Sequence, residues 1–103
     1  MIEKCLPASD WLIYIILCDD GTLYTGITTD IVRRWNQHKN KTGAKYFRGR
    51  CPEKLVYLEP SSCRSSASKR ESSLKKLQRR DKLILIKSAE NQVTHYNLTV
   101  LED

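Results

Sequence analysis

With 103 residues, 40% hydrophobic and 29% charged, the chain can form one compact domain with a small core, and its composition is that of an ordinary globular protein. No apolar run reaches the ~18 residues of a membrane span, and the first ten residues lack the apolar stretch of a secretory signal, so we expect a cytoplasmic protein. The net charge of +6 and the pI near 9.3 favour a polyanionic partner.

The cysteines give no sign of a metal or disulfide framework. Cys5, Cys18, Cys51 and Cys63 form no C-x-x-C pair, and their spacing matches no common zinc pattern. Because nothing in the sequence indicates export, we expect reduced, partly buried thiols.

A β-hairpin is the first predicted element. Residues 11–18 form an apolar run without a face period, which is typical of a central strand buried on both faces. The Asp-Asp-Gly sequence at 19–21 predicts a turn, after which residues 22–27 return as an antiparallel strand. The first strand carries Tyr14 and the second carries Tyr24.

A helix is predicted to follow the hairpin directly. The Thr-Thr-Asp sequence at 28–30 offers three successive N-cap residues, and the helix should run to about residue 40. Ile31, Trp35 and His38 have the spacing of one buried face. Arg34 lies one turn before His38 on a neighbouring face.

Residues 40–53 are predicted to be a polar loop, and residues 54–59 a third strand. Two interpretations of the loop aromatics stay open. Tyr46 and Phe47 stand among basic residues and could stack on bases, or they could pin the loop to the core.

A second helix should be capped by Ser65 or Ser66 and run to about residue 78. Glu71 lies at the edge of its buried stripe and is the only acidic residue from residue 64 to residue 80, a placement that calls for a reason. Residues 81–88 look like a short packed helix, with a strand as the alternative.

The chain is thus predicted to consist of an arm at residues 1–9, a domain at 10–88 and a tail at 89–103 that adds a strand or stays loose.

Fifteen of the 18 Lys and Arg residues fall in two segments, and the first, residues 31–52, contains no acidic residue. An acid-free basic run suits phosphate contacts, although charge runs are often only solvated faces. The cations that we expect to contact nucleic acid are Arg33, Lys39, Lys41, Lys45, Arg48, Arg50, Lys69 and Arg70.

The residue types suggest phosphodiester hydrolysis, which needs a water, an acceptor for its proton and positive charge for the pentavalent phosphorus. Arg34 could hold the phosphate as a forked, permanently charged donor, and Glu71 could bind one magnesium ion. Tyr14 or Tyr24 could handle the proton if neighbouring cations favour the phenolate.

In four ordered places the chain resembles the GIY-YIG nuclease domain family. Residues 12–14 (Leu-Ile-Tyr) and 24–26 (Tyr-Thr-Gly) stand where the family has Gly-Ile-Tyr and Tyr-Ile-Gly. Residues 29–38 look like its helix with an arginine and a histidine, and residues 67–71 like the helix that carries its metal-binding glutamate. The likeness covers roughly residues 10–88 and is greatest to small, stand-alone bacterial members.

The resemblance implies an α+β fold, with a three-stranded antiparallel sheet flanked by helices, and hydrolysis of DNA assisted by one Mg²⁺ or Mn²⁺ ion. Branched and single-stranded DNA are both open as substrates, and repair or processing as the role. The implied roles are general base for Tyr14, holding or tuning the site for Tyr24, stabilising the phosphorane for Arg34, orienting a tyrosine or contacting phosphate for His38, and metal binding for Glu71.

Three departures from the family pattern stand out. Leu12 replaces its first glycine, and Thr25 replaces the isoleucine of its second motif. A late asparagine found in several members has only Asn97 as a candidate.

Two rival functions remain. A non-catalytic nucleic-acid-binding module would keep the fold and the basic segments, but it would not require a lone carboxylate among cations. A protein-interaction domain would not require the basic segments.

Overall fold

The structure, a computed structural model, describes residues 11–41 and 45–95, with Tyr46 and His95 described by their backbone alone. The elements in these ranges are β1 (Leu12–Cys18), β2 (Leu23–Thr28), α1 (Ile31–Lys39), η1 (Lys45–Phe47, a 3-10 turn), β3 (Pro52–Pro60), α2 (Arg64–Lys75), α3 (Arg79–Ile86) and η2 (Val93–His95, a second 3-10 turn). The predicted arm and residues 96–103 of the predicted tail lie outside the described residues.

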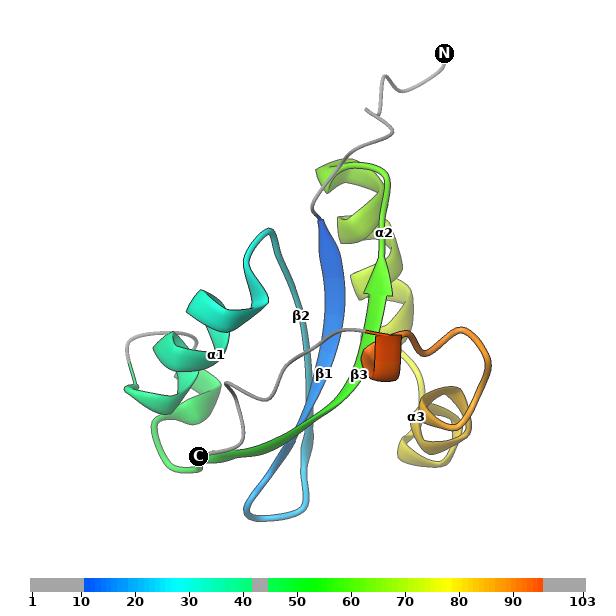
Figure 1. Cartoon of the computed structure of the whole chain (residues 1–103). Helices are drawn as coiled ribbons and strands as arrows, with labels where there is room; N and C mark the ends of the chain where they lie inside the picture. Colours follow the sequence, from blue (N-terminus) through cyan, green and yellow to red (C-terminus); the bar gives the residue numbers. More distant parts are fainter. Residues whose placement is uncertain (1–10, 42–44, 96–103) are drawn as a thin grey trace.

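The three strands form one antiparallel sheet in the order β2-β1-β3, with β1 in the centre. Helix α1 lies on one side of the sheet, and α2 and α3 lie on the other (Figure 1). This arrangement confirms the predicted fold class. No helix in the described ranges is long and apolar enough to cross a membrane.

Strand β1 is buried on both faces, as its continuous apolar run predicts. Its even positions, including Leu12 and Ile16, pack with Ile31 and Trp35 of α1. Ile13 and Ile15 pack with a second cluster that includes Ala67 and Leu74 of α2. Complete burial of one such aliphatic side chain contributes roughly 1.5–3 kcal/mol, so the two faces together fix β1 and the residues that it carries.

The register of β3 against β1 shifts at two places that the sequence does not predict, and the first is a bulge. Ile15 pairs with Tyr57 while its neighbour Ile16 pairs with Leu55, so one residue of β3 has no partner in the register. The extra residue places Tyr57 in the cluster under α2, while Leu55 joins the cluster under α1.

Two expectations about the second half of the chain are wrong in detail. Helix α2 begins at Arg64 with Cys63 as N-cap and not a serine, because Cys63 already has the extended backbone of a cap, although its side chain makes no capping hydrogen bond. Cys63 is also disulfide-bonded, which contradicts the expectation of reduced thiols for this residue, whereas Cys18 and Cys51 are free thiols. Spacing alone does not reveal which cysteines a fold brings together. Residues 81–86 are helical, as expected.

Candidate active site

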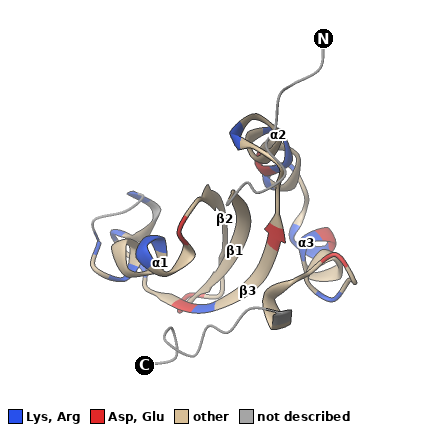
Figure 2. Cartoon of the chain, turned by 45° about the horizontal axis from the view of Figure 1, so that its top comes forward, with Lys and Arg blue, Asp and Glu red and all other residues tan. Residues whose placement is uncertain are grey.

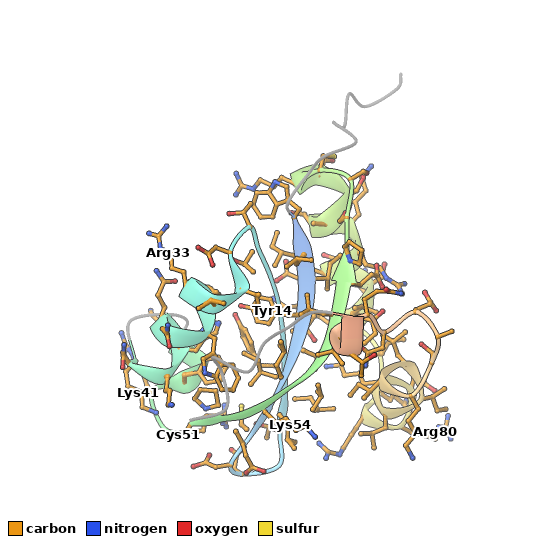
Figure 3. All side chains as sticks on the ribbon, viewed as in Figure 1. Tyr14, Arg33, Lys41, Cys51, Lys54 and Arg80 are labelled. Carbon is orange, nitrogen blue, oxygen red and sulfur yellow. The ribbon has the colours of Figure 1, made fainter. Side chains whose placement is uncertain are left out.

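The hydroxyl of Tyr14 is the centre of a buried polar cluster between β1 and α1. Tyr14 and His38 are both 0% exposed. Tyr14 Oη lies 2.8 Å from His38 Nε2, and Arg34 Nε donates to the same oxygen at 3.4 Å. Figure 3 shows Tyr14 between the central strand and α1. The structure therefore brings together three of the five predicted catalytic side chains around one oxygen atom.

Gly26 leaves the space that the Tyr14 ring occupies. The two residues face each other in the register of β1 and β2. A Cβ atom at position 26 would lie 2.5 Å from Tyr14 Oη and 2.6 Å from Tyr14 Cζ. A glycine is thus required opposite Tyr14 by close approach and not by backbone conformation.

Gly26→Ala should destabilise the fold by about 1–3 kcal/mol, the usual cost of overpacking a filled core, because the Tyr14 ring has to move. Gly49→Ala is the matched control, since a Cβ atom there meets nothing within 4 Å. Chemical denaturation of both variants checks this. Equal stabilities for the two would show that Tyr14 gives way without cost.

Burial sets the protonation of the cluster. Desolvation raises the pKa of Tyr14 well above its ordinary value near 10; Tyr24 and Glu71 add to the rise, and the hydrogen bond from Arg34 opposes it. Desolvation, and then the charge of Arg34, lowers the pKa of His38 to about 4. At neutral pH the pair is therefore a phenol and a neutral imidazole, so Tyr14 Oη donates to His38 Nε2 and accepts from Arg34. His38 Nδ1 has no hydrogen-bond partner among the described residues.

The low pKa of His38 predicts a loss of stability in mild acid. The unfolded chain takes up a proton at this residue below its ordinary pKa of 6.5, whereas the folded protein does so only near pH 4. Stability should therefore fall as the pH drops from 6.5 to 4, by about 3 kcal/mol for the full shift. Denaturation curves of the wild type and His38→Gln across this range check it. The variant should lack this part of the pH dependence, and identical slopes would contradict the assignment.

The aromatic rings of Tyr24 and Phe47 pack around the polar cluster. The Tyr24 ring lies 6.2 Å from the Tyr14 ring and 5.3 Å from the His38 ring, measured between centroids. Phe47 is completely buried and stands 4.3 Å from His38 and 5.0 Å from Tyr24. Phe47 therefore pins its loop to the core, and it also walls the histidine. The side chain of Tyr46 lies outside the described part.

Glu71 lies on α2, apart from the cluster. Its side chain is 22% exposed and pairs with Lys75, whose Nζ lies 3.2 Å from the carboxylate. Burial is the main cause of the raised pKa of Tyr14, and the charge of Glu71 is the smallest of its causes. Among the described residues there is no group of three His, Cys, Asp or Glu side chains that could hold a metal ion. A metal at Glu71 would therefore have fewer than three such ligands from the part of the chain that the structure describes.

Comparison with known proteins decides the family. The sequence profile of the GIY-YIG catalytic domain matches residues 10–84. The chain belongs to the GIY-YIG family. Catalytic domains of this family are of nuclease type and act on DNA.

The curated GIY-YIG relatives come from bacteria and archaea, so the branch extends beyond the bacteria expected from the sequence. The UPF0213 protein DP2720 of Desulfotalea psychrophila is 51% identical over 81 residues, which cover 78% of this chain and 74% of that protein. The UPF0213 protein VNG_2274C of Halobacterium salinarum is 47% identical over 70 residues, covering 68% of this chain and 91% of that one.

A solved structure shares the fold. The solution NMR structure of the UPF0213 protein BH0048 from Bacillus halodurans has a TM-score of 0.51 and 40% sequence identity, over 78% of this chain and 85% of that chain.

Two departures from the GIY-YIG pattern lie away from the reacting atoms. Leu12 is buried two residues before Tyr14, on the same face of β1. Thr25 is buried between Tyr24 and Gly26, and its hydroxyl has no partner among the described residues.

Asn91 is a late asparagine that no sequence pattern singles out. Its amide group donates to the carbonyls of Val56 and Ile86, and its Oδ1 accepts from the backbone of Leu58 and Val93. It thus ties β3 to the end of α3 and to η2, within the predicted tail. No periodic pattern marks such a residue, and Asn97, the candidate, lies outside the described residues.

Three of the eight cations expected to contact nucleic acid are occupied within the protein. Arg50 pairs with Asp20 at 2.8 Å, Lys41 Nζ donates to the Arg50 carbonyl at 2.7 Å, and Arg70 binds both carboxylate oxygens of Glu59. The other five are exposed: Arg33, Lys39, Lys45, Arg48 and Lys69.

Figure 2 shows Lys and Arg on all three helices of this GIY-YIG domain. Helix α1 has no acidic residue within its bounds, so the charged side chains on its exposed face are all positive, beside the neutral Asn36. That face lies on the Tyr14 side of the sheet.

Proposed function

We propose that this GIY-YIG domain is a metal-dependent endonuclease that hydrolyses phosphodiester bonds of DNA, in its repair or processing. The observation that carries the proposal is the buried Tyr14 hydroxyl, held between the neutral imidazole of His38 and the guanidinium of Arg34. An ordinary core tyrosine needs one partner for its hydroxyl. A partly buried guanidinium placed beside it suits a site that receives a phosphate.

Arg34 is the phosphate-holding residue in this proposal. Its Nε contacts Tyr14, and its Nη1 donates to Gln37 Oε1 at 2.9 Å, so two contacts fix the plane of the guanidinium before a substrate arrives. A preorganised, permanently charged donor stabilises the charge that develops on the phosphorane without having to reorient during the reaction.

Tyr14 and His38 form the proton path. Because the phenol stays protonated at neutral pH, Tyr14 accepts a proton from the attacking water as its own proton shifts to His38 Nε2 along the 2.8 Å hydrogen bond. His38 also keeps the hydroxyl oriented. Tyr24, whose ring borders both residues, holds them in place.

Glu71 is the proposed ligand for Mg²⁺ or Mn²⁺. A single, partly exposed carboxylate fits such an ion, because Mg²⁺ commonly keeps several waters and binds through one or two carboxylates plus substrate phosphate oxygens. When bound there, the ion would supply positive charge to the phosphorane and would offset the negative charge of Glu71, one of the causes of the raised pKa of Tyr14.

The exposed cations of α1 and the following segment are the proposed contacts with the DNA backbone. Arg33 and Lys39 lie on α1, which also carries Arg34, and Lys45 and Arg48 follow it. Contacts of this kind give affinity without sequence information, so binding should weaken steeply with salt.

The test is to incubate the protein with single-stranded, duplex and branched DNA, with Mg²⁺, Mn²⁺ or EDTA, next to Glu71→Ala. The proposal predicts cleavage of at least one DNA by the wild type with metal, and none by the variant. Binding by gel shift without cleavage of any DNA would instead support a non-catalytic binding module, for which the cationic face of α1 is the favouring observation.

A further inference from the structure

A hollow opens on the surface beside Arg34. It has a volume of about 270 Å³. Its lining residues come from the start of β1, the end of β2 and the first two turns of α1: Trp11, Ile27, Thr28, Thr29, Asp30, Arg33, Arg34 and Gln37. None of the functions assigned above uses Trp11, Ile27, Thr28 or Thr29 of this lining.

Arg34 connects the hollow to the reacting cluster. Its guanidinium contacts Tyr14 Oη through Nε and Gln37 through Nη1, and both Arg34 and Gln37 line the hollow. A phosphate held by Arg34 would therefore lie at the rim of the hollow. The nucleotide attached to that phosphate is the group within reach.

The walls of the hollow are fixed in place. The Trp11 carbonyl accepts a hydrogen bond from the Ser61 amide at 2.9 Å, and the Trp11 side chain packs against the core beneath α2. Asp30 caps α1 by accepting from the Arg33 amide at 3.1 Å, and Thr28 Oγ1 accepts from the Asp30 amide at 3.1 Å. The Asp30 carboxylate is thus engaged at the helix terminus.

We propose that this hollow binds the base of the nucleotide next to the phosphate held by Arg34, with Trp11 as its stacking surface. The proposal rests on the function proposed above. An indole beside an arginine is the combination on which bases stack regardless of sequence. The hollow is somewhat smaller than the ≈ 300–1,000 Å³ of sites for drug-sized ligands, so it suits a single planar ring system.

This assignment has a consequence for the substrate. A base inside a duplex is stacked and paired, and it would have to leave the helix to enter the hollow, at an energetic cost. The protein should therefore prefer a phosphate next to an unpaired base, as in single-stranded or branched DNA, over the same phosphate in a continuous duplex.

The first test uses the wild type alone. A set of single-stranded DNAs, each with one abasic site at a different position around the cleaved bond, is compared for binding in EDTA and for cleavage in Mg²⁺. Loss of one neighbouring base should weaken binding about 5- to 150-fold, the range for one stacked base. Equal affinity for every position of the abasic site would overturn the proposal.

The second test uses Trp11→Leu, which keeps apolar packing but not stacking, and Trp11→Phe, which keeps both. Thermal unfolding confirms that each variant is folded. The Leu variant should bind intact single-stranded DNA as weakly as the wild type binds the critical abasic DNA, with no further loss when the two changes are combined. Phe should restore most of the affinity. Independent, additive losses would overturn the assignment of Trp11.

The two proposals can fail separately. If the wild type cleaves DNA but the abasic position has no effect, the base site is wrong and the nuclease stands. If binding in EDTA depends on one base but no DNA is cut with any metal, the base site stands and the nuclease is wrong.

Discussion

Tyr14→Phe should lower the rate of DNA cleavage by about 10²–10⁴-fold, the range for losing a general acid–base group, while leaving DNA binding nearly unchanged. The hydroxyl contacts both His38 and Arg34, and the phenylalanine ring fills the same space beside Gly26. Single-turnover cleavage and a gel shift on the same preparation separate the two effects.

The matched control for Tyr14→Phe is Tyr57→Phe. Tyr57 is also completely buried, its pKa is also raised by burial, and its hydroxyl donates to Glu59 at 2.5 Å, but it belongs to the cluster on the α2 side of the sheet. Its cleavage rate should stay near that of the wild type. Equal losses for the two variants would show that a buried tyrosine hydroxyl matters here only for folding.

Glu71→Gln should reduce cleavage by about 10²–10³-fold, the range for losing one element of electrostatic stabilisation. The substitution keeps the size of the side chain and removes the charge that would attract the metal. It should also remove one cause of the raised pKa of Tyr14. Cleavage rates measured over a titration of Mg²⁺ check the prediction, because a lost ligand should weaken the response to the metal as well as the maximal rate.

Two further variants make the Glu71 experiment specific. Glu53→Gln changes the same net charge at an exposed position of β3 and should leave cleavage unaffected. Lys75→Gln removes the ammonium group 3.2 Å from Glu71, so it should lower the Mg²⁺ concentration needed for half-maximal activity. If Glu53→Gln and Glu71→Gln lost activity equally, the effect would come from net charge and not from a metal site.

The part of the site formed by the hairpin and α1 could be predicted from sequence, because turn chemistry and helix periodicity determine where its residues lie. A turn between two strands placed Tyr14 opposite the segment of Tyr24, and the three-to-four-residue period of a helix placed Arg34 and His38 together. Of the two interpretations of Phe47, the structure supports the one in which it holds its loop against the core, because its side chain is completely buried. The same buried ring also borders the site.

The features that could not be predicted from sequence depend on contacts between elements that are far apart in the chain. Arg70 looked like a DNA contact within a basic segment, but β3 brings Glu59 to it, and Glu90 also pairs with it at 3.1 Å. The four backbone bonds of Asn91 join elements that are far apart in sequence, and no spacing rule anticipates them. The bulge in β3 likewise depends on how β3 packs against β1.

For Glu71, the sequence and the structure supply different pieces of information. Its position on the edge of the buried stripe of α2 was predictable, and the structure adds that its charge acts on Tyr14 from another element. A metal at this residue would link the two halves of the site, with the proton path and the phosphate-holding arginine on one side and the carboxylate on the other.

The most direct test of this account is a single-turnover cleavage assay on one labelled DNA, with saturating protein, for the wild type, Tyr14→Phe and Glu71→Gln, in Mg²⁺ and in EDTA. The proposed mechanism predicts that the wild type cuts the DNA in Mg²⁺ and not in EDTA, and that both variants bind the DNA but cut it at least about 100-fold more slowly. Cleavage by the wild type in EDTA, or undiminished cleavage by either variant, would contradict it.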